Sequence, residues 1–298
     1  MYFGRGFCGN MAQELLNRFA LGIEYNGSRF CGWQRQPQGC SVQDAVEQAL
    51  SKLSRRPVAV VAAGRTDAGV HATGQVVHFD TPANWPLTAW IRGVNTFLPD
   101  SVAVIWAHSV NGEFHARYSA TARSYRYELL NRPVRPALNS GTAGWYHKPL
   151  DAKLMQEASD FLIGEHDFSS FRAAECQANT PVRRLSRLRV ERSGDRIVFE
   201  LTANAFLQHM VRNIVGALVY VGAGKQPPYW IGELLRQCDR TNAAPTFAAA
   251  GLHLCHVAYD PAWGLPNDDG AKRSVQTLLP NRTFPESNGN STLIGASM

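Results

Sequence analysis

The order in which two hydrophobic periods follow one another most constrains the fold of this chain. Apolar residues that alternate with polar ones predict a strand, and apolar residues three or four positions apart predict a helix. Both halves run strand, helix, strand, strand, helix, strand, with an additional helix near the end. This order predicts an α+β fold of two successive split β-α-β units, ferredoxin-like or RRM-like, with antiparallel sheets and helices on one face. The expected strands are 19–25, 58–63, 75–79, 102–108, 124–130, 185–191, 196–201 and 252–259, and the expected helices are 42–53, 87–97, 151–162, 206–221 and 230–238.

The first helix has a clear start signal. Ser41 stands at the expected N-cap position, and Asp44 follows three residues later. A serine at the N-cap accepts a hydrogen bond from the backbone of the third helical residue, and an acidic side chain there accepts one in return. We therefore expect the helix to begin directly after Ser41.

Composition divides the chain into four parts. Residues 1–17 form an N-terminal extension, in which Met11 is a candidate for the true start. Residues 18–118 form an N-terminal α/β domain that carries an aspartate loop, and residues 119–265 form a C-terminal α/β domain. Residues 266–298 are rich in Pro, Asn, Ser and Gly and are expected to form a mobile tail.

The basic residues of the chain are dominated by arginine. The 298 residues carry a formal charge of +6, with 25 Arg and only 5 Lys. The planar guanidinium group pairs with phosphates and stacks on flat rings, so this bias favours a nucleic-acid partner. The codon usage of a GC-rich genome would raise the arginine content equally well, and composition alone leaves both readings open.

No stretch of the sequence predicts a membrane span or an export signal. The most apolar segment, 210–224, is interrupted by Arg212 and Asn213, and the first ten residues lack the basic and apolar regions of a signal peptide. The cysteines contain no C-x-x-C pair and stand at positions 8, 31, 40, 176, 238 and 255. We therefore expect reduced thiols and a cytoplasmic location, without a membrane partner.

The string GRTDAGVH, residues 64–71, joins two apolar strands and contains one carboxylate, Asp67. Its glycines would let a ligand approach the backbone, and Arg65 would favour the ionised carboxylate that a nucleophile or base requires. An ordinary hairpin turn has a similar composition. On spacing alone, the turn is the more common outcome.

Arg212 lies on an expected helix among apolar residues. Burying an unpaired guanidinium is costly, so Arg212 should have a carboxylate or phosphate partner. An internal ion pair that only joins two elements and a functional pair fit this observation equally well.

Residues 114–127, FHARYSATARSYRY, interleave basic and aromatic side chains. Tyr125 and Tyr127 would share one face of a strand, where rings can stack on unpaired bases while arginines meet phosphates. A half-buried strand with a charged solvent face is the common alternative.

Several other chemistries lack their sequence motifs. His253, Cys255 and His256 do not have the spacing of a zinc site, so no metal is expected. The signature of zinc deaminases is absent, as are the P-loop, G-x-G-x-x-G and G-x-S-x-G strings.

Together, these segments resemble the bacterial-type tRNA pseudouridine synthase A family over residues 18–265. A G-R-T-D-x-G-V-H string followed by Y-x-Y and then H-M-V-R-N is a specific combination. The matching strings are LGIEYNGSRFCGWQRQ (21–36), AGRTDAGVHATGQVVHF (63–79), FHARYSATARSYRY (114–127), GEHDFSSFR (164–172) and NAFLQHMVRNIVG (204–216).

The resemblance implies an isomerase that converts uridine to pseudouridine at positions 38, 39 and 40 of the tRNA anticodon stem-loop, on a flipped-out base. By the same resemblance, Asp67 is the nucleophile and Arg212 is its ion-pair partner. Arg65 would help to expel the base, and Tyr125 would stack on the uracil. The resemblance also implies no metal or organic cofactor, and a homodimer whose shared basic cleft binds tRNA.

The residues alone leave two other functions open. One is an RNA-binding module without catalysis, although a binding surface gains nothing from a carboxylate that faces phosphate. The other is a carboxylate hydrolase acting on nucleosides or sugars, which usually needs a second acid, and none lies close to Asp67 in sequence. The sequence also does not choose between attack of Asp67 on C1′ and attack on the uracil ring.

Overall fold

The computed structural model describes residues 16–266. The first half of this range contains β1 (Asn17–Tyr25), α1 (Val42–Ser54), β2 (Val61–Ala62), β3 (His71–Thr81), α2 (Leu87–Asn95) and β4 (Val102–Val110). The second half contains β5 (Ala120–Asn131), β6 (Gly144–Tyr146), α3 (Ala152–Asp160), β7 (Gly164–Asp167), β8 (Val182–Ser193), β9 (Arg196–Ala203), α4 (Met210–Gly222), α5 (Trp230–Gln237) and β10 (Leu252–Tyr259).

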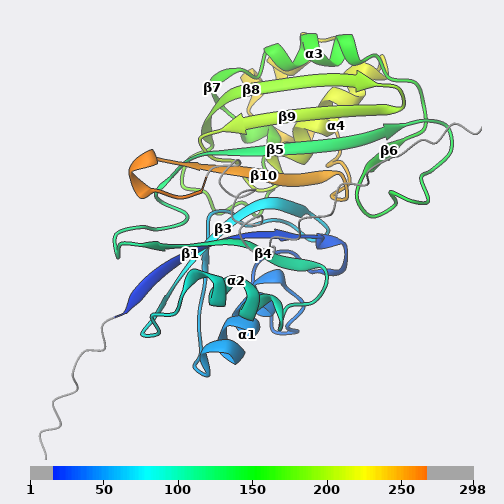
Figure 1. Ribbon diagram of the computed structural model, residues 1–298. Coiled ribbons are helices and arrows are strands. Elements are labelled where there is room, and N and C mark those ends of the chain that lie inside the picture. The colour runs from blue at the N-terminus through cyan, green and yellow to red at the C-terminus, as the bar shows by residue number, and fades with distance from the viewer. Residues whose placement is uncertain (1–15, 267–298) are drawn as a thin grey trace, which may run out of the picture.

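The strands form one continuous sheet in the order β4-β1-β3-β10-β5-β9-β8-β7, with β2 beside β3 and β6 beside β5 (Figure 1). Neighbouring strands are antiparallel except in the pairs β3–β10 and β5–β6. The α+β class is confirmed. The expectation of separate antiparallel sheets is wrong, because β3 and β10 pair along their edges and join the two halves.

Both halves share one strand order. Among β1 to β4, the first and third strands lie side by side, the fourth lies beside the first, and the second lies beside the third. In the second half, β5 lies beside β9, β10 lies beside β5, and β8 lies beside β9, so β5, β8, β9 and β10 correspond to β1, β2, β3 and β4. The two halves are therefore related by topology.

One edge of β3 serves two strands. Residues 71–72 pair with β10, whereas residues 77–78 pair with β2. Between these stretches, a Cβ atom on Gly74 would lie 2.1 Å from the Cys255 carbonyl oxygen, so only glycine permits this approach. The regular strand expected at 58–63 is reduced to β2, and beyond it the Ala63 N–H donates to the Val76 carbonyl at 2.8 Å.

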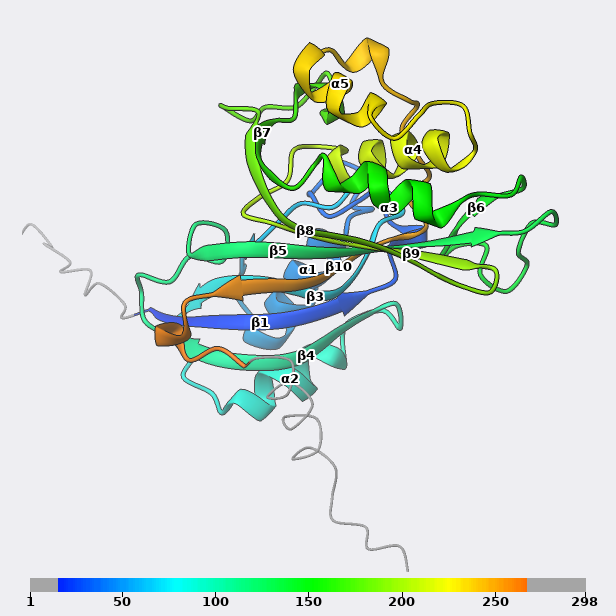
Figure 2. The same ribbon diagram turned by 90° about the horizontal axis from the view of Figure 1, so that it is seen from above.

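The helices divide between the two halves of the sheet. α1 contacts α2, which packs on β4, whereas α3 packs on β8 and contacts both α4 and α5 (Figure 2). The predicted start of the first helix is confirmed: the Ser41 hydroxyl accepts from the Asp44 backbone at 3.1 Å, and the Asp44 carboxylate accepts from the Ser41 backbone at 3.2 Å.

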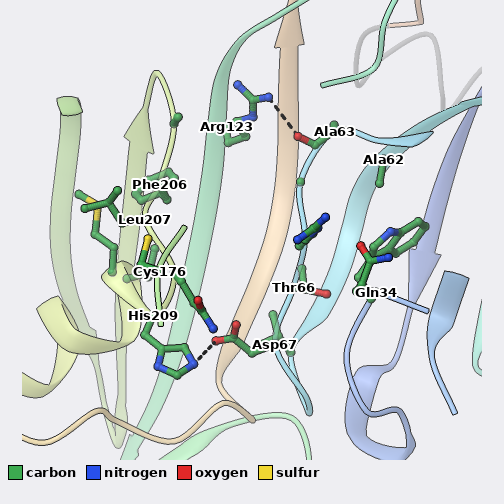
Figure 3. Close-up of a pocket in the computed structure, with 18 of the residues that line it drawn as sticks. Gln34, Ala62, Ala63, Thr66, Asp67, Arg123, Cys176, Phe206, Leu207 and His209 are labelled. Carbon is green, nitrogen blue, oxygen red and sulfur yellow. Dashed lines mark hydrogen bonds and ion pairs between the residues drawn. The ribbon is translucent and has the colours of Figure 1, made fainter. Parts of the chain in front are cut away.

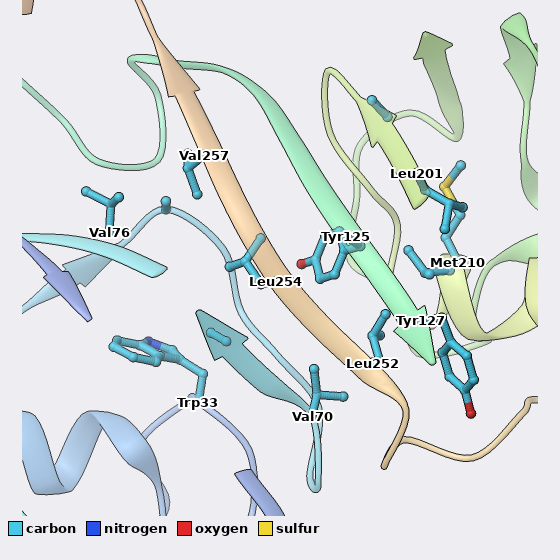
Figure 4. Packing of buried hydrophobic residues seen from close by; sticks show 14 of the residues in the cluster. Trp33, Val70, Val76, Tyr125, Tyr127, Leu201, Met210, Leu252, Leu254 and Val257 are labelled. Carbon is cyan, nitrogen blue, oxygen red and sulfur yellow. The ribbon is translucent and has the colours of Figure 1, made fainter. Parts of the chain in front are cut away.

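A single hydrophobic core crosses the junction between the halves. Trp33 and Val70 from the first half lie near Tyr125 and Leu254 from the second (Figure 4), and all four are buried. Truncating a fully buried leucine such as Leu254 typically costs about 2–5 kcal/mol. The junction thus contributes to the stability of both halves.

The helix expected at 206–221 begins later than predicted. His209 has a left-handed backbone conformation with φ 63°, and α4 starts at the next residue, Met210. Residues 204–209 consequently form a loop after β9. The short strands β6 and β7 were not predicted.

Cys31 and Cys40 form a disulfide, so the expectation of reduced thiols is wrong for this pair. Their Cα atoms lie 5.6 Å apart, and the Cys31 N–H donates to the Cys40 carbonyl at 3.0 Å. No sequence motif indicates this pairing, because the two cysteines meet only after residues 32–39 have folded back. Cys176, Cys238 and Cys255 are free thiols.

Residues 16–266 contain no helix that is long and apolar enough to cross a membrane. The proposed start at Met11 and the tail from residue 267 onward lie outside the described residues. Asn17, which we assigned to the extension, is the first residue of β1.

Candidate active site

A cavity of about 970 Å³ lies where the two halves meet (Figure 3). The loop between β2 and β3 and the segment 31–36 contribute to its lining from the first half. Segments 175–178 and 205–212, together with Tyr125 on β5, contribute from the second. Each half therefore supplies part of one site.

The loop between β2 and β3 is tied to the core at Thr66. The Thr66 hydroxyl shares a hydrogen bond of 2.8 Å with Tyr25 Oη, and its carbonyl accepts from the Trp33 N–H at 2.9 Å. Burial raises the pKa of Tyr25 to about 12, so this hydroxyl stays neutral. These bonds fix the backbone directly before Asp67.

Gly32 allows the segment 31–36 to press against this loop. Its φ is 101°, and a Cβ atom there would lie 2.8 Å from the Thr66 carbonyl oxygen. Residues with a side chain rarely adopt such a φ, and the space is also too small for one. The disulfide between Cys31 and Cys40 closes this segment into a small loop. The segment thus packs against the outer side of the loop that carries Asp67.

Asp67 and Arg212 form an ion pair across the cavity. Arg212 Nη1 donates to Asp67 Oδ2 at 2.9 Å, and the two side chains are 17% and 26% exposed. A partly buried pair is screened less by water and salt than a surface pair. The carboxylate also lies near the N-terminus of α4, where the helix dipole favours an anion.

Arg212 is held at a second point. Its Nε donates to the Phe247 carbonyl at 2.8 Å, so the guanidinium plane is fixed before Nη1 reaches Asp67. A two-point hold of this kind uses the fork geometry that distinguishes arginine from lysine. The position of the Asp67 carboxylate is thereby defined from both halves of the chain.

Tyr125 lies on β5 and is 9% exposed. Its ring meets the edge of Phe206 at a centroid distance of 5.0 Å and an angle of 83°. A Cβ atom on Gly64 would lie 4.0 Å from the Tyr125 hydroxyl, so the ring lies close to the Asp67 loop. Burial raises the pKa of Tyr125 well above its usual value, and the side chain is a neutral phenol.

Two further arginines of the site, Arg65 and Arg123, differ in their surroundings. Arg65 lines the cavity and is exposed. Arg123 is tied down: Nη2 donates to the carbonyls of Ala63 at 3.0 Å and Arg117 at 2.7 Å, and Nη1 donates to the Asn204 carbonyl at 3.0 Å (Figure 3). Arg123 therefore bridges the two halves, whereas Arg65 can turn toward a ligand.

The structure brings Asp67, Arg65, Tyr125 and Arg212 to one cavity. Sequence reasoning gave no role to His209, whose Nε2 lies 3.5 Å from Asp67 Oδ2. The helical pattern placed His209 inside a helix, and nothing in that pattern distinguished it from its neighbours. Arg123 was noted only as one basic residue among several.

Within residues 16–266, no three His, Cys, Asp or Glu side chains are grouped as metal ligands. His253 stacks instead on His71, with ring centroids 4.7 Å apart.

Comparison with known proteins identifies the class of enzyme. The family model described as tRNA pseudouridine synthase matches residues 22–119 and 158–260. The chain is thus a tRNA pseudouridine synthase, an intramolecular isomerase.

Relatives named tRNA pseudouridine synthase A are similar over nearly their whole length. The protein of Thiobacillus denitrificans is 58% identical, covering 84% of this chain and 96% of the relative. That of Methylobacillus flagellatus is 56% identical, covering 87% and 98%, and that of Dechloromonas aromatica is 58% identical, covering 85% and 97%. The chain belongs to the tRNA pseudouridine synthase A family, which confirms the resemblance seen in the sequence.

Among solved structures, a chain of a Cbf5-Nop10-Gar1 complex matches with a TM-score of 0.32 and 11% identity, covering 79% of this chain and 48% of that one. Similarity at this level supports no inference.

Proposed function

We propose that this enzyme forms pseudouridine at positions 38, 39 and 40 of the tRNA anticodon stem-loop, with Asp67 as the nucleophile. The observation that carries the proposal is the Asp67 carboxylate, held by Arg212 at 2.9 Å beside a cavity of about 970 Å³. Small-molecule sites commonly measure roughly 300–1,000 Å³, which leaves room for one nucleotide.

The reaction requires the target base to leave the RNA stack. Enzymes that act on a base within a helix extrude the nucleotide into a pocket and offset the unstacking cost there. Arg65, exposed at the cavity, would occupy the space that the base leaves. The Tyr125 ring would stack on the uracil, an interaction worth about 1–3 kcal/mol per base.

The chemistry breaks the bond between N1 and C1′ and forms one between C5 and C1′. An ionised Asp67 would attack either C1′ or the uracil ring and so stabilise the separated fragments. Arg212 holds the carboxylate in one orientation, since its own guanidinium is anchored on the Phe247 carbonyl. No metal or organic cofactor is needed for these steps.

The charge of the cavity lining suits a polyanion. Its arginines would meet phosphates on either side of the flipped nucleotide, and we infer that two copies form a homodimer with a shared basic cleft. These arginines are Arg65, Arg117, Arg123, Arg183 and Arg212.

The test uses anticodon stem-loops with a single 5-tritiated uridine at position 38, 39 or 40. Pseudouridine formation releases the tritium from C5, so the purified enzyme should release it from each of the three. A stem-loop whose labelled uridine lies elsewhere in the loop is the control and should retain its label. Release from the control, or from none of the three while full-length tRNA is modified, would overturn the assigned positions.

A further inference from the structure

The imidazole of His209 lies beside the proposed nucleophile. Its Nε2 is 3.5 Å from Asp67 Oδ2, and the side chain is 29% exposed to the cavity (Figure 3). Arg212 contacts the same oxygen at 2.9 Å. The carboxylate therefore has a permanent cation beside it and, separately, a group that can exchange a proton.

The backbone holds His209 there at a cost. Its φ of 63° is left-handed, which costs an ordinary residue about 1–2 kcal/mol. His209 is the N-cap of α4, yet its side chain makes no capping hydrogen bond. A serine, asparagine or glycine would suit this position better, so helix formation does not explain the histidine. Strained residues of this kind recur at functional sites.

The proposed reaction leaves one proton transfer without an assigned group. Once C5 is bonded to C1′, C5 still carries its hydrogen, which must leave before pseudouridine is complete. At that stage Asp67 is either still bonded to the ring or, after attack on C1′, the departing carboxylate that Arg212 holds. The guanidinium of Arg212 cannot accept a proton. Tyr125 is a neutral phenol because burial raises its pKa, so it is a poor base. Glu175 and Cys176 also line the cavity, but the side chains that contact the Asp67 carboxylate are those of Arg212 and His209.

We propose that His209 is a catalytic residue that removes the proton from C5 of the reattached uracil. The proposal rests on the function proposed above. Asp67 must lie next to C1′ or the uracil ring. After reattachment C5 is bonded to both C1′ and C6, so it lies within one or two bonds of the atom that Asp67 attacks. A nitrogen atom 3.5 Å from the carboxylate oxygen is consequently within reach of the C5 hydrogen.

The step balances without a further reactant. The Nε2 lone pair takes the C5 proton, and the electron pair of the C5–H bond forms the C5=C6 double bond. If Asp67 attacked C1′, the electrons of the N1=C6 double bond move to N1; if it attacked C6, its C6–O bond breaks and the carboxylate leaves. In either case N1 takes up one proton, from the imidazolium directly or through water. Histidine returns to its neutral form, and the overall reaction remains an isomerisation.

His209→Asn is the first test variant, because asparagine tolerates a left-handed backbone and cannot act as a base in this step. We expect kcat to fall by about 10²-fold or more, with tRNA affinity unchanged in filter binding. His147→Asn is the matched control, since His147 is exposed and does not line the cavity; it should keep full activity.

A kinetic isotope effect separates a base from a structural residue. In the wild type, 5-deuterated uridine should react at nearly the same rate as ordinary uridine if an earlier step limits turnover. In His209→Asn, C5–H cleavage becomes rate-limiting, so deuterium should slow turnover clearly. Added imidazole should also restore part of the activity of His209→Gly.

Three outcomes would overturn the proposal: full activity of His209→Asn, lost activity without an isotope effect, or no rescue by imidazole. A wild-type enzyme that releases no tritium from any anticodon stem-loop would instead refute the proposed function. Tritium release by the wild-type enzyme therefore distinguishes a failure of the proposed function from a failure of the role proposed for His209.

Discussion

Arg212 links Asp67 to the opposite half of the chain: Nη1 donates to Asp67 Oδ2 at 2.9 Å, while Nε donates to the Phe247 carbonyl at 2.8 Å. Asp67 lies on the loop before β3, and Arg212 lies in the first turn of α4. The ion pair thus joins the two halves of the chain through side chains, as the pairing of β3 with β10 joins them through backbone hydrogen bonds.

Replacing Arg212 with alanine should abolish activity and lower the free energy of unfolding by about 1–3 kcal/mol, because a partly buried carboxylate and a carbonyl lose their donor. Arg212→Lys should recover part of the stability but little activity, since one ammonium cannot serve both acceptors in the same geometry. Urea unfolding and tritium release measure the two effects. Arg236→Ala, at an exposed position on α5, serves as control; equal behaviour of the two alanine variants would refute the role of the pair.

Asp67→Ala should lower turnover by at least about 10³-fold, because the proposed covalent step has no other nucleophile. Affinity for the anticodon stem-loop should stay close to the wild-type value, since the arginines of the cavity remain. Tritium release and filter binding on the same preparation provide the comparison. Undiminished release by the variant would remove Asp67 from the mechanism.

His78 should make the protein less stable in weak acid. It is 4% exposed on β3, and its Nδ1 accepts from the Ala116 N–H at 3.1 Å. Burial, with a smaller contribution from the positive charge of Arg18, lowers the pKa of His78 from 6.5 to about 4. Between these two pH values the unfolded chain binds a proton that the folded chain does not, so stability falls as the pH drops, by at most about 3 kcal/mol.

The corresponding measurement is urea unfolding between pH 7 and pH 4.5. His78→Gln should show a shallower loss of stability with acid, although not a flat one, because burial also lowers the pKa of His71 and His253. His147→Gln, at an exposed site, should keep the wild-type slope. An unchanged slope in His78→Gln would show that His78 does not take up the proton.

Reducing the disulfide between Cys31 and Cys40 should lower the free energy of unfolding by about 2–3 kcal/mol, the value expected for a short closed loop. The double variant Cys31→Ser/Cys40→Ser should lose the same amount and become insensitive to reductant. Cys238→Ser, which removes an exposed free thiol, should behave like the wild type. Thermal unfolding with and without reductant, together with thiol counting, tests this expectation; a wild type whose stability ignores reductant would contradict it.

Local signals predicted individual elements well. The Ser41–Asp44 capping pair marked the start of α1, and the strand expected at 252–259 has the same bounds as β10. Both elements depend on interactions between residues that are close in the sequence, so the local sequence pattern is enough to predict them.

The joining of the halves was not predictable in the same way. Pairing of β3 with β10 connects residues 71–72 with 253–254, and no local pattern encodes a contact over that separation. The delayed start of α4 was missed for a related reason: the left-handed backbone of His209 overrides a helical pattern that runs through it. The resemblance to a family brought Asp67 and Arg212 together, where spacing alone left a turn and an internal ion pair open.

Because one sheet runs unbroken through both halves, residues 16–266 contain no separate hinge segment about which the two halves could open and close around a nucleotide. Separating the halves would break the β3–β10 ladder, the Arg123 bridge and the shared core at once. If the enzyme is rigid, the tRNA must change its conformation to bring the target base into the site. The ease with which a tRNA bends and frees the target base should then influence which tRNAs are modified fastest.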